Sequence, residues 1–370
     1  MKTFMLLFML LPQLSLLVIF AFTPYFTRKT ESFGVSIPKD VYHLPQVVSI
    51  RSRYKNNVLI TGILLLAAAF ILILLDQTEK TEILISLSIV VQLVLGGVFY
   101  LSGHKKMKAL KSESNWTQDK KQVTVIDTDF RSKKMLVSPL WFLLYGIVIS
   151  FTAALTVIFY DRMPDRLPMQ FNITGEITRW AGKSLLSVSW PLIIQIFITV
   201  LLIFVYWIIR KSKQQIEAEN PEISMKQNQM FRYKWSAFIV ITGLALITIF
   251  MFIPLSHAGF VGYASFSIVS AVLTIGIIVY AIILSVKTGQ GGSRIKIGQD
   301  KESDFINRDD DKYWKMGVFY YNPDDPALFI EKRFGIGWTC NFARPLSWVF
   351  IIGLLVFVTI SIIASSYMTK

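Results

Sequence analysis

The sequence predicts an all-α integral membrane protein with about eight transmembrane helices and a small β-hairpin-like module before the last helix. Three observations predict this class. Hydrophobic residues make up 53% of the chain and charged residues only 17%, which is too apolar for an ordinary soluble domain. Eight apolar segments are long enough, at about 20 residues, to cross a bilayer as helices. Their interiors contain no Asp, Glu, Lys, Arg or His.

The predicted spans, in chain order, are residues 4–26, 58–75, 83–102, 136–160, 185–209, 236–254, 261–286 and 346–366. The first of them, which follows Lys2, could instead be a secretory signal. We expect a retained helix, because the run lacks a small-x-small cleavage site and has Pro12 and Gln13 in its middle.

The distribution of basic residues predicts the orientation in the membrane. Most of the 38 Lys and Arg residues lie in four connecting stretches, 27–57, 103–135, 210–235 and 287–345. Cytoplasmic loops accumulate such residues, so we expect these stretches inside and both termini outside the cell membrane. Because the charge of +14 is spread over several loops rather than gathered on one domain, nucleic acid is not an expected partner.

These spans and loops divide the chain into five regions. Residues 1–135 form a three-span region with basic loops, 136–209 a helix-loop-helix module, and 210–286 a two-span region. Residues 287–344 form an aromatic cytoplasmic module, and 345–370 the last helix.

The loop between the fourth and fifth spans predicts a structured, hairpin-like cap. Pro164 and Pro168 favour extended backbone before them, and residues 172–175 have the composition of a turn that ends in a flexible glycine. Leu167, Phe171 and Trp180 would then rest on the helix ends. The residues alone leave open whether this cap is a ligand site or a structural clasp.

The pattern Pro-Asp-x-x-Pro, Phe-Asn, Gly-Glu and Lys-Ser in this loop resembles the extracytoplasmic module of the bacterial SdpI family. The matching positions are Pro164, Asp165, Pro168, Phe171, Asn172, Gly175, Glu176, Lys183 and Ser184. The resemblance implies a multipass cell-membrane protein that confers immunity to a secreted toxin and sequesters a transcriptional repressor. The candidate binding residues outside are Pro164, Asp165, Pro168, Phe171, Asn172, Gly175, Glu176, Arg179 and Trp180. Gln170 departs from the histidine that relatives commonly have, and Ile177-Thr178 from their Pro-Asp.

The stretch before the last span contains two aromatic runs around a Pro-bounded turn, which predicts a hairpin that pairs residues 314–321 with 327–334. Because two strands alone are marginal in water, we expect the hairpin to dock on the bilayer, another loop or a partner. We expect Phe319 and Tyr321 on the docking face; the alternative is the side of Tyr320. The stretch also resembles an uncharacterised module of larger SdpI-type proteins. Its candidate residues are Trp314, Phe319, Tyr320, Tyr321, Asn322, Pro323, Asp324, Asp325, Pro326, Arg333 and Trp338.

No catalytic or metal-binding motif is evident. The chain lacks a Gly-rich phosphate loop, a His-Glu-x-x-His pair and a Gly-x-Ser-x-Gly elbow, so we expect neither an enzyme nor a cofactor. The three histidines are scattered over three loops, so no metal site is expected. Cys340 is the single cysteine, which excludes an intramolecular disulfide.

The expected function is therefore immunity to, or sensing of, an envelope-active toxin or peptide. The partners would be the lipid bilayer, the secreted toxin or peptide outside, and a repressor or other protein inside. Two alternatives stay open: a transporter or permease subunit for a small hydrophobic or cationic compound, and a structural accessory of a membrane complex. The uncharged spans disfavour ion-coupled transport. The sequence leaves the oligomeric state open.

Overall fold

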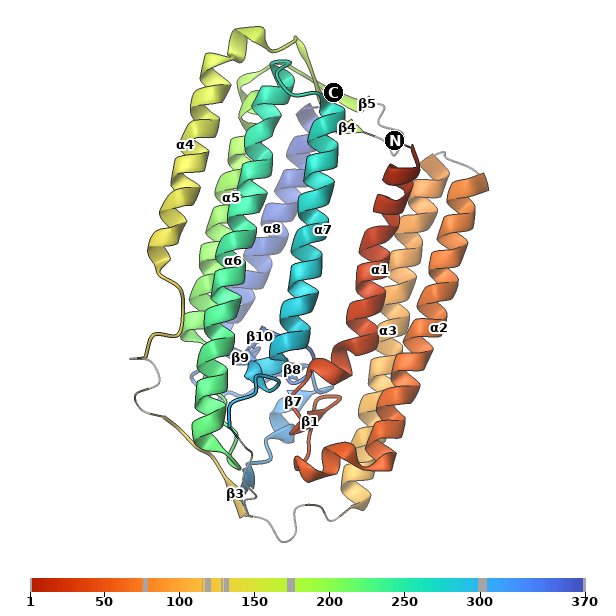
Figure 1. Cartoon of the computed structure of the whole chain (residues 1–370), viewed down its shortest axis with the longest axis vertical. Coiled ribbons are helices and arrows are strands. Elements are labelled where there is room, and N and C mark those ends of the chain that lie inside the picture. Colours follow the sequence, from red (N-terminus) through yellow and green to blue (C-terminus); the bar gives the residue numbers. More distant parts are fainter. Residues whose placement is uncertain are drawn as a thin grey trace.

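The long helices of the chain stand side by side in one bundle (Figure 1). This computed structural model describes residues 2–75, 79–114, 116, 121–127, 129, 133–171, 177–298 and 305–368. The helices in this part of the chain are α1 (Lys2–Phe26), α2 (Pro45–Leu75), α3 (Glu79–Glu113), α4 (Leu143–Ile158), α5 (Leu185–Lys211), α6 (Pro221–His257), α7 (Tyr263–Thr288) and α8 (Pro345–Met368). The predicted class, an all-α multipass membrane protein, is confirmed.

Seven of the described helices, α2 to α8, are long and apolar enough to cross a membrane. The described apolar part of α1 is the shorter segment Leu10–Phe26. Large apolar side chains such as Leu64, Leu75 and Leu185 remain mostly exposed on the outer faces of the helices. Such an apolar exterior is expected where hydrocarbon, rather than water, surrounds the protein.

The helices form two groups (Figure 1), α1 to α3 and α4 to α8, which meet where α1 approaches α7. Within the first group a small residue sets the helix spacing. A Cβ atom added to Gly62 on α2 would lie 2.4 Å from the Leu17 side chain on α1. The second group has a comparable contact, because a Cβ atom on Gly243 would lie 2.1 Å from the Tyr145 hydroxyl. In both helix groups, a glycine therefore lets a side chain of a neighbouring helix pack directly against the helix backbone.

One end of the bundle, which we call the hairpin end, holds strands β4 (Arg166–Phe171) and β5 (Ile177–Gly182) together with both chain ends (Figure 1). The two strands pair antiparallel, with Leu167 opposite Ala181 and Pro168 opposite Trp180. The predicted hairpin-like cap is therefore present in the described residues of this loop. The 3₁₀ turns η3 (Pro139–Phe142) and η4 (Tyr160–Arg162) flank α4.

The opposite end, which we call the basic end, is built from the four Lys- and Arg-rich stretches. Within the described residues, its strands form four short pairs, which are β1 (Glu31–Ser32) with β2 (Val35–Ser36), β3 (Lys121–Val123) with β6 (Phe305–Asn307), β7 (Trp314–Lys315) with β8 (Phe319–Tyr320), and β9 (Phe329–Glu331) with β10 (Trp338–Cys340). The remaining short turns are η1 (Asp40–His43), η5 (Gln290–Gly292) and η6 (Asp311–Tyr313).

The predicted pairing of residues 314–321 with 327–334 is wrong. Trp314 pairs instead with Tyr320, and Ile330 with Thr339, so each aromatic run folds back on a nearer neighbour. Met316 and Gly317 both have positive φ, at 52° and 72°, and close a tight β-turn between β7 and β8. Turns of this hand match the twist of a hairpin, so the local turn decides the pairing.

The prediction that Phe319 and Tyr321 form the docking face of this module is also wrong. The alternative side, that of Tyr320, is the buried one. Phe319 and Tyr321 are 47% and 48% exposed, whereas Tyr320 is 3% exposed. Tyr320 packs with Trp314 and Ile330 in a small core of its own. The module is therefore a folded unit whose inner face is set by Tyr320.

Candidate functional site

A cavity of about 430 Å³ lies beneath β4 and β5, against the ends of α5, α6 and α7. Most of its wall is apolar, from Met169, Trp190, Pro191, Ile194, Phe250, Ile253 and Phe266. Its polar lining comes from Gln170, Arg179, Ser187, Ser256, His257 and Tyr263, with Pro168 of β4 beside them. This mixture of an apolar wall and a few polar groups is typical of a small-ligand or peptide side-chain site.

The polar groups of this hairpin-end cavity are partly unsatisfied. Ser256 is buried, and its hydroxyl has no partner among the described residues. The buried His257 imidazole interacts with the backbone of Pro168 and so links α6 to β4. Arg179 is exposed at the rim and makes no described ion pair. The cavity therefore offers a buried hydroxyl inside and a cationic side chain at its mouth.

The hairpin is attached to the helices by Lys183 and Ser184. The Lys183 amide donates to the Asp165 carbonyl at 2.8 Å, and its Nζ donates to the Met163 carbonyl at 3.1 Å. Ser184 caps α5 because its hydroxyl accepts a hydrogen bond from the Ser187 amide at 3.2 Å. In return, the Ser184 amide donates a hydrogen bond to the Ser187 hydroxyl. The Lys-Ser pair thus fixes where the loop ends and the helix begins.

The structure brings only some of the predicted outer residues together. Pro168 and Arg179 line the cavity, whereas Pro164 and Asp165 are exposed outside it and Trp180 is half-exposed beside it. Asn172, Gly175 and Glu176 lie outside the described residues, as does the side chain of Phe171. The cavity residues of α5, α6 and α7 were not among the predicted site residues. Their one signal was a concentration of aromatic residues near span ends.

At the basic end, a buried carboxylate joins distant parts of the chain. Glu331 of β9 is fully buried, and its Oε1 accepts hydrogen bonds from Asn228 at 2.7 Å and from Arg232 at 3.3 Å. Its Oε2 forms an ion pair with Arg28, which follows α1. The two arginines are 3% or less exposed. Glu331 thereby connects the segment after α1 with α6 and the aromatic module, and we call this set of contacts the Glu331 junction.

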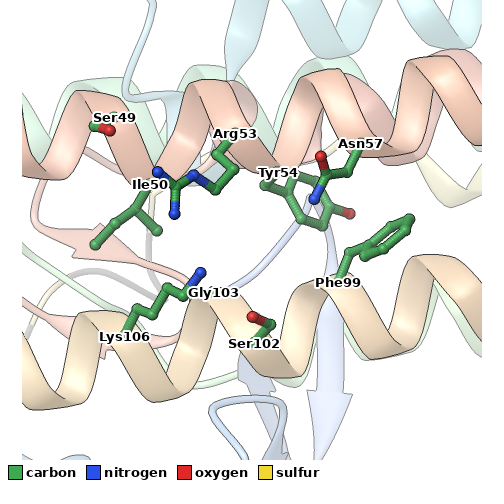
Figure 2. A pocket seen from close by; sticks show the side chains of 9 residues that line it. All are labelled: Ser49, Ile50, Arg53, Tyr54, Asn57, Phe99, Ser102, Gly103 and Lys106. Atoms are coloured by element: carbon green, nitrogen blue, oxygen red, sulfur yellow. The ribbon is translucent and has the colours of Figure 1, made fainter.

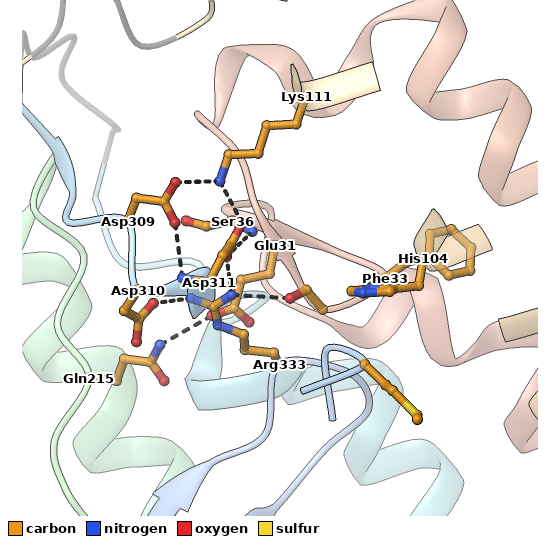
Figure 3. A network of polar contacts seen from close by, with 12 residues as sticks. Glu31, Phe33, Ser36, His104, Lys111, Gln215, Asp309, Asp310, Asp311 and Arg333 are labelled. Atoms are coloured by element: carbon orange, nitrogen blue, oxygen red, sulfur yellow. Dashed lines mark hydrogen bonds and ion pairs between the residues drawn. The ribbon is translucent and has the colours of Figure 1, made fainter. Parts of the chain in front are cut away.

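A second charged cluster of the basic end includes Lys111 of α3 (Figure 3). Arg333 is buried, pairs with Asp310 and Asp311, and donates to the Gly34 carbonyl at 3.1 Å. Lys111 of α3 reaches Asp309 at 2.7 Å and Asp311 at 2.6 Å. Although burial opposes ionisation, Arg333 and Lys111 lower the pKa of Asp311 below its usual range.

Glu31 is the exception among these charges. It is buried near Arg28 and Arg333, and its Oε1 accepts a hydrogen bond from Gln215 at 3.1 Å. Its Oε2 has no partner among the described residues. Burial raises the pKa of Glu31 to about 7, against the opposing attraction of the two arginines. Glu31 is therefore a carboxyl that titrates near neutral pH.

The predicted site residues of the aromatic module divide into a buried set and an exposed set. Trp314, Tyr320, Asn322, Asp325 and Arg333 are buried, whereas Phe319, Tyr321, Pro323, Asp324 and Pro326 are exposed. The five buried residues, together with Asp324 and Pro326, border a cavity of about 500 Å³. Trp338 is partly buried and packs on Phe231 of α6. In the cavity wall, Asp325 accepts hydrogen bonds from Lys213 at 2.6 Å and Tyr320 at 2.8 Å.

The predicted turn around Pro323 is held by Asn341, which was not among the predicted site residues. Asn341 donates to the carbonyls of Asn322 at 2.8 Å and Asp325 at 3.1 Å, and accepts from the Asn322 amide at 3.1 Å. Glu331, Arg28, Arg232 and Asn228 were missed as well. The one sequence feature that indicated a charged junction was the position of Glu331 and Arg333 directly after an apolar run.

The fold and its two structured ends define a multipass helical membrane protein. Two family models match parts of it. A domain of unknown function (DUF1648), which is found in SdpI-like membrane proteins, matches residues 147–194, and a family of unknown function (DUF5808) matches residues 323–348. The first match covers the hairpin with parts of α4 and α5, and the second runs from the Pro323 turn into α8. No curated protein and no solved structure matches the chain.

Proposed function

We propose that the protein is an SdpI-like membrane protein that recognises an apolar, envelope-active agent and relays its presence to a partner on the other side. The agent would be a peptide or a small amphipathic compound, and the outcome would be immunity or sensing. The observation that carries this proposal is the 430 Å³ apolar cavity beneath the hairpin. A membrane-active agent has the apolar surface that such a wall would bind.

The distribution of basic residues supports the sidedness of this proposal. The hairpin end carries few of the lysines and arginines, and the basic end carries most of them. By the positive-inside rule, the hairpin cavity would face outward and the aromatic module inward. An agent from outside would then meet the cavity first, and an exposed pair such as Phe319 and Tyr321 could meet a partner inside.

A single helix supports the relay. Phe250 and Ile253 of α6 line the hairpin-end cavity, while Asn228 and Arg232 of the same helix hold Glu331. Phe250 follows Arg232 by 18 positions, which is about 27 Å along the helix. A shift of α6 on binding would therefore be felt at the Glu331 junction. Such a relay requires two conformations of the protein that differ in the placement of α6, and an agent that binds one of them more tightly than the other.

The cavity role is tested by filling the cavity. Full-length wild type, Ile194→Trp and Ile196→Trp would be expressed in a bacterial host exposed to a panel of membrane-active peptides, with survival measured at matched membrane abundance. Ile194 lines the cavity, whereas Ile196, on the same helix, is 52% exposed on the outer face. We expect wild type and Ile196→Trp to protect against at least one peptide and Ile194→Trp to lose protection. Equal protection by all three proteins would contradict a role for the cavity.

A further inference from the structure

A groove between α2 and α3 at the basic end contains two cationic side chains (Figure 2). It is a hollow of about 100 Å³, lined by Ser49, Ile50, Arg53, Tyr54, Asn57, Phe99, Ser102, Gly103 and Lys106. Neither family match covers these residues. The groove is also distinct from the hairpin-end cavity and from the Glu331 junction.

Among the described residues, the two cations of the groove have no counter-charge. Figure 2 shows Arg53 extending from α2 and Lys106 from α3 into the space between the two helices. None of the described residues that line the groove is Asp or Glu, and neither cation makes an ion pair with a described residue. Two like charges on facing helices repel each other, and an anion between them would convert this repulsion into attraction.

Neutral hydrogen-bonding groups surround the two cations. Ser49, Asn57 and Ser102 are exposed in the groove wall. The Tyr54 ring is buried and packs edge-on against the Phe33 ring, with the two ring centroids 5.3 Å apart. The Tyr54 hydroxyl makes no hydrogen bond within the described residues. A Cβ atom on Gly103 would come within 2.7 Å of the Phe33 ring, so a glycine is needed for this packing. The groove thus combines two cations with free hydroxyl and amide groups, as anion sites do.

The position of the groove along the helices suggests the source of the anion. The groove lies where the apolar part of each helix gives way to its polar extension. One or two turns towards the apolar side, α2 exposes Ile60, Ile63 and Leu64 and α3 exposes Val94 and Val98. An anionic head in the groove would therefore have apolar surface directly beside it for acyl chains. Basic pockets between helices at the membrane boundary bind anionic headgroups in this way.

We propose that this groove binds the phosphate-bearing headgroup of an anionic phospholipid. Arg53 and Lys106 hold the phosphate oxygens, and Tyr54 and Ser102 donate further hydrogen bonds. The acyl chains lie along the exposed apolar residues of α2 and α3. The lipid would stabilise the packing of α2 against α3 at the level where both helices leave the apolar layer.

The test measures lipid binding to the purified full-length protein in detergent, by native mass spectrometry with phosphatidylglycerol and phosphatidylcholine titrated separately. We expect phosphatidylglycerol to bind at least about tenfold more tightly than phosphatidylcholine. The double variant Arg53→Gln, Lys106→Gln should lose this preference. Lys105→Gln with Lys108→Gln is the matched control, because it removes two exposed charges from the same region of α3 and should keep affinity within about twofold.

Three outcomes would overturn the proposal. Equal affinity for the two lipids would mean that the groove does not recognise the anionic headgroup. An equal loss in the Lys105 and Lys108 variant would reduce the effect to general surface charge. Displacement of phosphatidylglycerol by inorganic phosphate at comparable concentration would assign the groove to a free anion rather than to a lipid. Melting temperatures of both double variants would be compared with wild type, so that loss of binding is separated from loss of folding.

Discussion

The two ends of the bundle are held by different kinds of contact. At the hairpin end, the described polar contacts are mostly neutral hydrogen bonds, such as the Ser184 cap of α5, and the space beneath the strands is an apolar cavity. At the basic end, buried charges hold the chain together, with Glu331 between Arg28 and Arg232. One end thus offers an accessible apolar surface, and the other a fixed polar junction.

This difference follows from which segments each end must join. The hairpin connects neighbours in the chain, α4 and α5, so a short loop with a helix cap suffices. The basic end joins Arg28 to Glu331, which are 303 residues apart, and so unites both helix groups. A buried ion pair adds little net stability, but its geometry is specific and the loss of one partner is costly. The comparison therefore predicts that charge substitutions act strongly at the basic end.

The largest effect is expected for Glu331→Gln. The substitution leaves Arg28 and Arg232 buried without their carboxylate, which should lower the free energy of unfolding by about 4 kcal/mol. The expected result is a markedly lower melting temperature of the purified protein in detergent and reduced membrane abundance.

Glu222→Gln is the control for this substitution, because Glu222 is an exposed residue in the first turn of α6 and should cost about 0.5 kcal/mol. Adding Arg28→Gln to Glu331→Gln should cost less than the sum of the two single effects, since the pair is coupled. A Glu331→Gln protein with the wild-type melting temperature would show that these charges do not hold the basic end.

The next largest effect is expected for Tyr320→Ala. Tyr320 packs against Trp314, with ring centroids 5.1 Å apart, and its hydroxyl donates to Asp325. Its truncation should cost about 3 kcal/mol and accelerate proteolysis near Asn322 in membranes whose basic side is accessible. Phe319→Ala, at the exposed neighbouring position, should change stability by about 0.5 kcal/mol or less. Equal cleavage of both variants and the wild type would mean that the aromatic module is not folded against its surroundings.

The sequence predicted the helices better than it predicted their connections. Apolar runs of bilayer length are a local signal, and predicted spans such as 4–26 and 185–209 lie within α1 and α5. The helices α2, α3 and α6 extend well beyond the predicted spans, because their ends are polar and carry no apolar signal. The hairpin was also recognisable from its prolines and turn residues, whereas Lys183 and Ser184 were noted only as positions of a family pattern, without their role in attachment.

The contacts at the basic end were not recognisable in the same way. The approach of Arg28 to Glu331 depends on how whole helices pack, which no local spacing encodes. The pairing of Trp314 with Tyr320 depends on the positive φ of Met316, a residue type that gives no warning of it. The hairpin-end cavity likewise combines residues of three helices that are distant in the sequence.

The last of the expected effects appears only at high pH and concerns Glu31. Burial raises the pKa of this carboxyl to about 7, above its value in the unfolded chain. Between these two pKa values the folded protein retains a proton that the unfolded chain has lost, so the contribution of Glu31 to stability falls as the pH rises through this window. Below the window both states are protonated, and the penalty is absent.

Glu31→Gln removes this titration and retains a neutral side chain that can still accept a hydrogen bond from Gln215. The variant should nearly match the wild type at about pH 4.5 and exceed its stability by about 3 kcal/mol at pH 8. Melting temperatures across this range, with the exposed Glu113→Gln as control, measure the difference. Parallel curves for Glu31→Gln and wild type would mean that Glu31 is already ionised and paired in the folded protein. The basic end would then hold one more buried charge, and its contrast with the largely neutral contacts of the hairpin end would be sharper still.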